Sequence, residues 1–317
     1  MKDRTIAFIP QTGHGIGHIS RCLALADVHY NWNAIFFASE NYGLNLINYP
    51  KEIVADKIFD KKIDEYIKKI KPDVIVIDLL DFNRSVFGTW RKFAQTICLF
   101  DFAASIDKKL FDLVINTNPS VPLEGKDTLS GTAYVPLSHD LLEYRRTYKV
   151  QKHVKTAFIS LGGSDPKDQT QNILEAFKSL DLYTYVVIGP GFNKKNWKQR
   201  KNIRFVESPS RAEFHSLMSL SDIAITTAGN TMYEVSCIGI PNIVICNHQN
   251  HLGTATYFAQ KEAVINLGIQ PETKVILDSI KILVNDAEGR AKLSTIAKSL
   301  VDGYGADRIK KIISSKL

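Results

Sequence analysis

The chain has 317 residues, of which 44% are apolar and 23% charged, and Lys plus Arg exceed Asp plus Glu by 40 − 33 = 7. This composition fits a folded protein of about two domains and excludes a chain that is mostly disordered. The modest positive charge suits an anionic partner, such as a phosphorylated metabolite, a nucleic acid or an anionic membrane face, without selecting among them.

Short apolar runs alternate with longer amphipathic stretches along the whole chain. In the first half they predict strands at Thr5–Ile9, Ala34–Ala38, Val74–Ile77, Thr96–Phe100 and Leu113–Asn116, and helices at Ile19–Ala26 and Arg84–Ala94. In the second half they predict strands at Thr156–Ser160, Tyr183–Ile188, Ile223–Thr226, Asn242–Cys246 and Ala263–Leu267, and helices at Gln169–Leu180, Arg211–Leu220, Thr231–Ile238 and Thr254–Lys261. Continuous apolar strands that alternate with helices predict an α/β fold with parallel sheets covered on both faces.

The two halves begin alike, each with an apolar strand that runs into a glycine-containing loop and then a helix. Each therefore predicts the start of its own doubly wound sheet. The polar stretch 144–153 has the composition of a linker, so we expect Rossmann-like domains over residues 1–149 and 150–317. Two such domains would place the ends of both sheets on one ligand cleft. Residues 302–317 are expected to form a last helix that can cross back to the first domain.

The first glycine loop contains Gly15 and Gly17, followed at once by His18 in the first turn of a helix. Glycines let the backbone approach a phosphate, whose charge a helix N-terminus favours. Ser20 takes the third glycine position of the dinucleotide fingerprint, so this is a different loop. The helix N-terminus disfavours an imidazolium, so we expect a neutral His18 that can act as a base. A capping or packing role for His18 fits the spacing equally well.

The second half carries two more loops of this kind. Gly162-Gly163-Ser164 precedes Asp165-Pro166, and its amides can hold a nucleotide phosphate or ribose, although a capped turn without a ligand is the alternative. Gly229-Asn230-Thr231 opens a helix whose first amides can bind an anion. Glu234 lies one turn further, where it can reach a diol such as a ribose or simply complement the helix dipole.

Five polar residues, Asn247-His248-Gln249-Asn250-His251, follow a buried strand and suit hydrogen bonding to a polar ligand, with a solvated loop as the alternative. No Cys or carboxylate stands at ligand spacing from the two histidines, and there is no DxD triplet. The sequence therefore predicts chemistry without a metal or other cofactor. The basic run 194–201 is typical of a surface loop, with contact to an anionic membrane as the alternative.

Other features bear on location and partners. The four cysteines lie far apart without a CxxC pair, which indicates reduced thiols and a cytoplasmic protein. The first apolar run is too short for a signal peptide or a spanning helix. No motif for nucleic-acid binding is present, so no nucleic-acid partner is expected.

Three stretches together resemble a known family: GIGHISRCLALA at 15–26, SLGGSDP at 160–166 and AGNTMYEVSCIGIP at 228–241. They resemble motifs of the UDP-sugar hydrolases of pseudaminic acid biosynthesis and the related spore-coat polysaccharide proteins. The resemblance spans most of the chain with the motifs in order. It implies the glycosyltransferase B fold, with a UDP-sugar as substrate.

The resemblance also implies roles. His18 would activate water at the anomeric carbon so that UDP leaves with inversion, and Asn250 would belong to the same active site. The expected nucleotide-binding residues are Gly15, Gly17, Gly162, Gly163, Ser164, Gly229, Asn230, Thr231 and Glu234. Arg21 and His251 are the expected substrate residues.

The chain departs from the family at four places. It has Ile9-Pro10-Gln11 where the family has Arg-x-Asp, and Asp78-Leu79-Leu80-Asp81 where the family has Asp-His-Tyr. It has Phe100-Asp101 in place of Asp-Asp, and His251 in place of the Gln of Asn-Gln. Most of these lie in the domain expected to shape the sugar and acceptor side. The motifs favour a hydrolase of a UDP-activated deoxyamino sugar. A glycosyltransferase acting on a glycan or lipid acceptor is the alternative, followed by a non-catalytic nucleotide-sugar binding protein.

Overall fold

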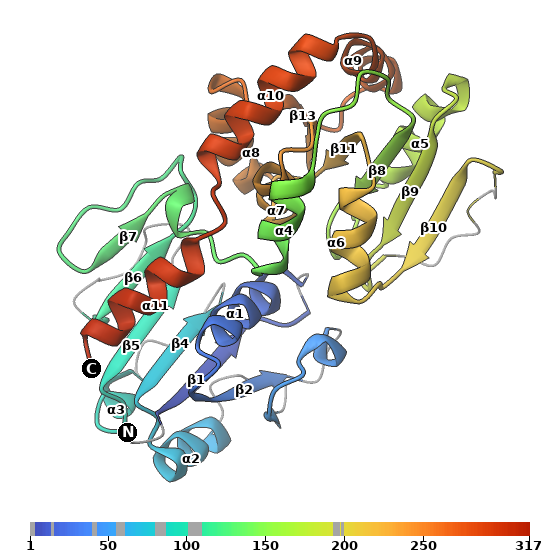
Figure 1. Cartoon of the computed structure of the whole chain (residues 1–317). Helices are drawn as coiled ribbons and strands as arrows, with labels where there is room; N and C mark the ends of the chain where they lie inside the picture. Colours follow the sequence, from blue (N-terminus) through green and yellow to red (C-terminus); the bar gives the residue numbers. More distant parts are fainter. Residues whose placement is uncertain are drawn as a thin grey trace. The chain divides into compact units, whose positions relative to one another are not determined.

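A computed structural model describes residues 4–13, 16–39, 43–54, 61–79, 87–100, 110–192, 197 and 200–317. The chain forms two compact units (Figure 1): the first is Met1–Ser138 with Gly303–Leu317, and the second is His139–Asp302. The last helix, α11 (Gly305–Ser315), thus belongs to the first unit. The chain enters the second unit at residue 139 and not near residue 150.

The earlier boundary has a physical cause in helix α4 (Asp140–Thr147), which overlaps the stretch expected to be a linker. This helix packs against α7 (Asn230–Ile238). Arg145 of α4 donates from Nη1 to the carbonyl oxygens of Cys237 at 2.8 Å and Val301 at 3.0 Å, and from Nη2 to that of Lys298 at 3.0 Å. These bonds satisfy carbonyls at the C-terminal ends of α7 and α10 (Ala287–Leu300) and hold α4 to the second unit.

The described part of the first unit contains a seven-stranded parallel sheet in the order β3-β2-β1-β4-β5-β6-β7. Its strands are β1 (Thr5–Pro10), β2 (Asn33–Ser39), β3 (Lys51–Val54), β4 (Val74–Asp78), β5 (Thr96–Phe100), β6 (Leu113–Asn116) and β7 (Thr128–Ser130). Its helices are α1 (Gly17–Val28), α2 (Lys61–Ile70), α3 (Phe87–Trp90) and α11, with short 3₁₀ turns η1 (Leu44–Leu46) and η4 (Thr132–Tyr134).

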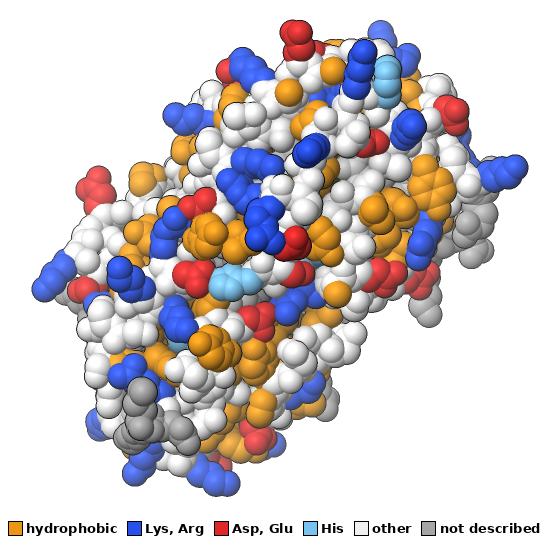
Figure 2. Space-filling view, viewed as in Figure 1, with side chains coloured by type: hydrophobic (Ala, Val, Ile, Leu, Met, Phe, Trp, Pro, Cys, Tyr) orange, Lys and Arg blue, Asp and Glu red, His pale blue; other side chains and the backbone are white. Residues whose placement is uncertain are grey.

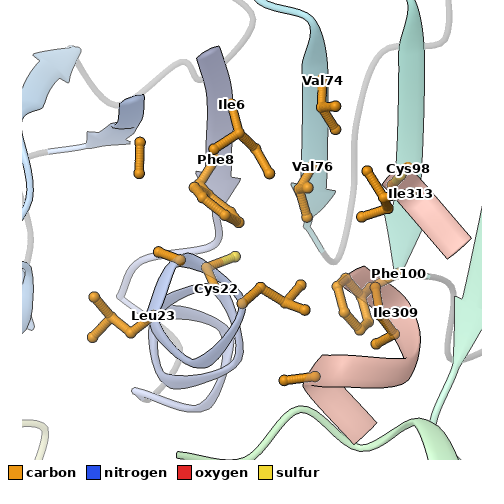
Figure 3. Packing of buried hydrophobic residues seen from close by; sticks show 14 of the residues in the cluster. Ile6, Phe8, Cys22, Leu23, Val74, Val76, Cys98, Phe100, Ile309 and Ile313 are labelled. Atoms are coloured by element: carbon orange, nitrogen blue, oxygen red, sulfur yellow. The ribbon is translucent and has the colours of Figure 1, made fainter. Parts of the chain in front are cut away.

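Alternation along the strands divides the core of the first unit between the two faces of the sheet. Ile6 and Phe8 of β1 face α1 and α11, which lie side by side on one face, with Ile309 of α11 beside Phe100 and Ile313 beside Cys98 (Figure 3). On the other face, Ala7 and Ile9 pack with residues of α2 and α3.

The close contact of α11 with the chain at Val135 requires Gly305, because a Cβ there would lie 2.1 Å from the Val135 carbonyl oxygen.

The second unit has a six-stranded parallel sheet in the order β10-β9-β8-β11-β12-β13, within the described residues. Its strands are β8 (Thr156–Ser160), β9 (Tyr183–Ile188), β10 (Ile203–Glu207), β11 (Ile223–Thr226), β12 (Asn242–Cys246) and β13 (Ile265–Ile269). Besides α4, α7 and α10, the helices are α5 (Gln169–Ala176), α6 (Arg211–Ser219), α8 (Gln249–Gln260) and α9 (Thr273–Asn285), and the 3₁₀ turn η5 (Phe177–Ser179) follows α5.

The core of the second unit follows the same alternation. Ala157 and Ile159 of β8 pack with α5 and α9 on one face. Phe158 lies on the other face in an edge-to-face contact with Phe214 of α6, with ring centroids 5.4 Å apart. Two parallel, doubly covered sheets confirm the predicted α/β class with two Rossmann-like units.

The structure contains elements that the sequence analysis did not name, and some bounds differ. Strands β3, β7 and β10 and helices α2, α4, α9 and α10 are additional, and β13 begins two residues later than expected. Helix α8 begins at Gln249 and not at Thr254, so the polar run after β12 is partly helical. Of the helix expected at 84–94, Phe87–Trp90 is helical, and residues 84–86 lie outside the described part.

On the face drawn in Figure 2, cationic, acidic and hydrophobic side chains are interspersed. The described residues include no helix that is both long and apolar enough to span a membrane. All four cysteines are buried and free of disulfides, and burial raises the pKa of each thiol.

Candidate active site

In the first unit, the site is built where β1 ends and α1 begins. Because β1 pairs in parallel with β4, Pro10 stands opposite Asp78, the last residue of β4. The backbone N–H of Gln11 donates to the Asp78 carbonyl at 2.7 Å, and Gly13 turns the chain with a φ of 81°, in the left-handed region. Gly17 is the first residue of α1, whereas Gly15 lies outside the described residues.

His18, the second residue of α1, is buried and points to the end of β4. Its Nδ1 lies 2.7 Å from Oδ1 of Asp78 and 3.1 Å from the Asp78 carbonyl oxygen. An ionised carboxylate only accepts hydrogen bonds, so this contact places the proton on Nδ1 and makes Nε2 the basic nitrogen. The His18 side chain retains 11% of its exposure. The ring is therefore oriented by a buried carboxylate, an arrangement in which Nε2 could act as a general base toward a hydroxyl or a water.

Arg21 completes the cluster by binding the same carboxylate. Its Nε donates to Oδ2 of Asp78 at 2.8 Å, and its Nη2 donates to Oδ1 at 3.0 Å. Nη2 also lies 3.0 Å from Nδ1 of His18. Both nitrogens carry protons and donate to Oδ1 of Asp78, so they do not form a hydrogen bond with each other. Burial alone would raise the pKa of Asp78, but the Arg21 guanidinium and His18 hold it below its ordinary value. We infer that Arg21 positions Asp78, although the sequence predicted it to contact the substrate.

Asp78 was missed as a functional residue, since the sequence presented it only as a departure from the family motif. The available signal was an acid at the carboxyl end of a predicted strand. In the strand order 3-2-1-4 of a doubly wound sheet, that strand lies next to the first strand and its glycine loop.

In the second unit, three of the predicted motifs meet at one edge of the sheet. Strands β8, β11 and β12 are neighbours and parallel, so the residues that follow them share the carboxyl edge. Oγ1 of Thr227, after β11, lies 3.1 Å from Nδ1 of His251, after β12. Asn247 donates from Nδ2 to the carbonyl of Leu161, after β8, at 3.0 Å. The structure therefore brings the two loops in which the sequence predicted nucleotide binding together with the run predicted to bind a polar ligand.

The loop that contains Gly162, Gly163 and Ser164 has a shape that only glycine permits. Gly162 has a φ of 91°, in the left-handed region. Gly189, which follows β9 and was not predicted, lies so close that a Cβ there would be 2.5 Å from the Gly162 carbonyl oxygen and 2.6 Å from that of Gly163. Asp165 accepts the backbone N–H groups of Gln169 and Thr170 at 3.0 and 2.7 Å and so caps α5. These contacts restrict the conformation of the loop.

The N-terminus of α7 contributes Gly229, Asn230 and Thr231. Gly229 is the N-cap residue and carries no side chain to cap the helix, and a helix start of this kind favours an anion. Glu234, one turn along, is 9% exposed. Its Oε1 lies 3.7 Å from Nε2 of His215, a residue of α6 that the sequence did not single out.

The two remaining predicted residues belong to the first turn of α8. Asn250 is exposed, and its catalytic assignment stays a prediction. His251 is partly buried and stands edge to face with His248 at 5.4 Å. Burial, aided by His248, lowers the pKa of His251 to about 4, so the ring is neutral at pH 7. A neutral imidazole has one donor and one acceptor nitrogen, and the side-chain amide of glutamine, the residue of the family motif at this position, is also neutral and both donates and accepts.

Some predicted features lie outside the described residues, including Asp81, Asp101 and most of the basic run 194–201. Within that run Trp197 stacks on Phe205 of β10, with ring centroids 5.7 Å apart. Among the described residues, no cluster of three His, Cys, Asp or Glu side chains could hold a metal ion.

Three curated proteins resemble the chain in sequence. It is 25% identical over 321 residues to the spore coat polysaccharide biosynthesis protein SpsG of Bacillus subtilis, and the match covers 94% of each chain. It is 29% identical over 267 residues to the uncharacterized protein MJ1062 of Methanocaldococcus jannaschii, covering 77% of this chain and 55% of MJ1062. The chain thus spans about half the length of MJ1062 but nearly all of SpsG. No protein-family model matches it.

The third relative is a Helicobacter pylori protein described as pseudaminic acid cytidylyltransferase and UDP-2,4-diacetamido-2,4,6-trideoxy-beta-L-altropyranose hydrolase. The match is 31% identical over 153 residues, which are 47% of this chain and 26% of that longer protein.

Solved structures define the fold. MurG of Acinetobacter baumannii superposes with a TM-score of 0.67 at 13% identity, covering 99% of each chain. The calicheamicin glycosyltransferase CalG4 also gives 0.67 at 14% identity, covering 100% of this chain and 99% of its own. UDP-GlcNAc 2-epimerase of Neisseria meningitidis, bound to UDP-GlcNAc, gives 0.65 at 12% identity, covering 98% and 100%. The chain therefore has the predicted glycosyltransferase B fold, which these proteins use for more than one reaction.

Proposed function

We propose that the chain is a metal-independent enzyme that hydrolyses a UDP-activated deoxyamino sugar at its anomeric carbon and releases UDP. The substrate would be of the UDP-2,4-diacetamido-2,4,6-trideoxyhexose type, used in the biosynthesis of a surface nonulosonic acid or polysaccharide. The observation that carries the proposal is the pairing of His18 with the buried, Arg21-bound carboxylate of Asp78, which gives one imidazole a fixed basic nitrogen.

In this mechanism Nε2 of His18 accepts a proton from a water molecule as the water oxygen bonds to the anomeric carbon. The bond between that carbon and the diphosphate oxygen breaks, and UDP leaves with the electron pair. Asp78 stabilises the imidazolium that forms, because its ionised carboxylate lies 2.7 Å from Nδ1. General-base catalysis of this kind contributes about 10²–10⁴-fold.

The second unit would bind the UDP. The diphosphate suits the amides of the 162–164 loop and of the α7 N-terminus, where a left-handed Gly162 and an uncapped Gly229 leave the backbone open to a close approach. Glu234 would accept hydrogen bonds from the ribose hydroxyls. Asn250 and the neutral His251 would contact the sugar from the start of α8.

One sequence relative supports hydrolysis as the first candidate. The Helicobacter pylori protein, which matches 47% of this chain, is described as including a hydrolase of a UDP-linked diacetamido sugar. Glycosyl transfer is the second candidate because CalG4, which shares the fold, is a glycosyltransferase. The two reactions need a similar base and differ in whether water or an alcohol occupies the acceptor position.

The test is an incubation of purified protein with a panel of UDP-activated deoxyamino sugars and no acceptor, followed by mass spectrometry of the products. Release of UDP and free sugar supports hydrolysis. Release of UDP only after addition of a glycan or lipid acceptor supports the transferase. Binding of the nucleotide sugar with no release under either condition supports a non-catalytic binding protein and contradicts both enzymatic proposals.

A further inference from the structure

His215 of α6 is a buried residue that lies between two carboxylates in the second unit. Its Nδ1 is 2.6 Å from Oδ2 of Asp140, the first residue of α4, and its Nε2 is 3.7 Å from Oε1 of Glu234 on α7. The His215 side chain is only 2% exposed, whereas that of Asp140 is 41% exposed and that of Glu234 is 11% exposed. One ring therefore joins three helices, and solvent reaches only its two carboxylate partners.

The charges of the two carboxylates favour a protonated ring. Burial alone would lower the pKa of His215, but the carboxylates of Asp140 and Glu234 raise it to about 9. The Cys237 thiol, one turn beyond Glu234, stays neutral because burial raises its pKa to about 11. At neutral pH the ring therefore carries two N–H groups, one directed to each carboxylate.

The His215 cation stabilises the ionised carboxylate of Glu234. A carboxylate that is mostly buried loses hydration, and a neighbouring cation offsets that loss. The 3.7 Å separation is an ion pair and longer than a hydrogen bond, so it leaves the lone pairs of Glu234 available to a ligand. A vicinal diol presents two O–H donors, and an ionised carboxylate has two oxygens that can accept them.

We propose that His215 is a positioning residue: held as a cation by Asp140, it orients the Glu234 carboxylate toward the ribose hydroxyls of the bound nucleotide. This inference rests on the proposed binding of UDP by the second unit. In this inference, the preference for a ribonucleotide over a deoxyribonucleotide depends on the contacts of Asp140 on α4 with His215 on α6 and of His215 with Glu234 on α7. If His215 had only a structural role, it would stabilise the packing of the three helices and would not affect the preference for a ligand with a 2′-hydroxyl.

The diol contribution is measured as the ratio of the Kd of 2′-deoxy-UDP to the Kd of UDP. In the unaltered protein this ratio should be about tenfold or more, because deleting one hydroxyl leaves a buried charged acceptor unpaired. In His215→Gln and in Asp140→Asn the ratio should approach one, while the Kd of 2′-deoxy-UDP changes little. Glu143→Gln is the matched control, because this carboxylate is also on α4 but is exposed and paired with Arg146.

The pH dependence gives a second readout. As the pH rises through about 9, His215 loses its Nε2 proton, and a lone pair then faces Glu234. The ratio should therefore fall in the unaltered protein and stay flat in His215→Gln. Ionisation of the uracil base in the same range affects both ligands and cancels in the ratio. An NMR titration of the His215 ring in the unaltered protein needs no substitution and should show a protonated ring at pH 7.

The outcomes separate this inference from the proposed function. A protein that binds no UDP would overturn the proposed function and this inference with it. UDP binding with an unchanged ratio in His215→Gln and Asp140→Asn, or a neutral His215 ring at pH 7, would overturn the positioning role alone. Equal weakening of both nucleotides in the two variants would show that His215 has only a structural role.

Discussion

Oδ1 of Asp78, at the end of β4, lies 2.7 Å from Nδ1 of His18 in the first turn of α1. The two residues are 60 positions apart in the sequence, and the parallel pairing of β1 with β4 brings them together. The contact orients the ring, because the carboxylate fixes which nitrogen carries the proton, and it leaves Nε2 as the nitrogen for the proposed base.

Asp78→Asn should lower kcat for UDP release by about 10²–10⁴-fold, since the amide no longer fixes the His18 tautomer or stabilises an imidazolium. The Kd for UDP should stay within a few-fold, because Asp78 belongs to the first unit and the nucleotide loops to the second. Steady-state kinetics and calorimetry measure the two quantities. The double variant with His18→Ala should be no slower than His18→Ala alone, since the two residues act as one group. Additive losses would contradict the pairing.

Substitutions at Arg21 separate a positioning role from contact with substrate. Arg21→Met should cost about 3–5 kcal/mol of unfolding free energy, because it leaves the buried Asp78 carboxylate without its cation. Arg21→Lys should cost less, as a lysine keeps the charge but loses the two-point contact. Urea unfolding measures both. A variant of unchanged stability but raised KM for the UDP-sugar would instead support the substrate role expected from the sequence.

Gly189→Ala should weaken UDP binding although Gly189 is outside the predicted loop. A Cβ at this position would lie 2.5 Å from the carbonyl oxygen of Gly162, so the 162–164 loop must move. Overpacking costs about 1–3 kcal/mol, and each 1.4 kcal/mol expressed in binding is about tenfold in Kd. Gly131→Ala in the first unit is the control, because its φ of 93° gives strain without a clash. An unchanged Kd in Gly189→Ala would mean that UDP does not bind this loop.

His251→Gln should make the unfolding free energy less dependent on pH. The pKa of His251 is about 4 in the folded protein and 6.5 ordinarily, so between these values only the unfolded chain binds the proton. Stability is therefore full above about 6.5 and falls by about 3 kcal/mol as the pH decreases to about 4, at about 1.36 kcal/mol per pKa unit. In His251→Gln the unfolding free energy should not show this decrease of about 3 kcal/mol. His153→Gln is the control, because it removes an exposed histidine. The same slope in His251→Gln and the unaltered protein would contradict a buried neutral ring.

The sequence predicted the parts of this molecule that depend on local pattern. Continuous apolar runs such as Thr156–Ser160 became the predicted strands, and His18 stands beside the glycine loop as expected. What the sequence did not predict depends on contacts between distant residues. Asp78 and His215 acquire their importance from neighbours 60 and 75 positions away, and Gly189 from the approach of a loop on another strand. Helix α4 was missed because its polar composition resembles a linker, whereas contacts with α7 stabilise it.

The most direct test of the base assigned to His18 is UDP release from a UDP-activated deoxyamino sugar in H₂¹⁸O without an acceptor, comparing the unaltered protein with His18→Ala. We predict that the unaltered protein releases UDP free of ¹⁸O, because water attacks the sugar carbon, and that His18→Ala binds UDP normally but releases it about 10²–10⁴-fold more slowly. Release at an unchanged rate by His18→Ala, or ¹⁸O in the released nucleotide, would contradict the account.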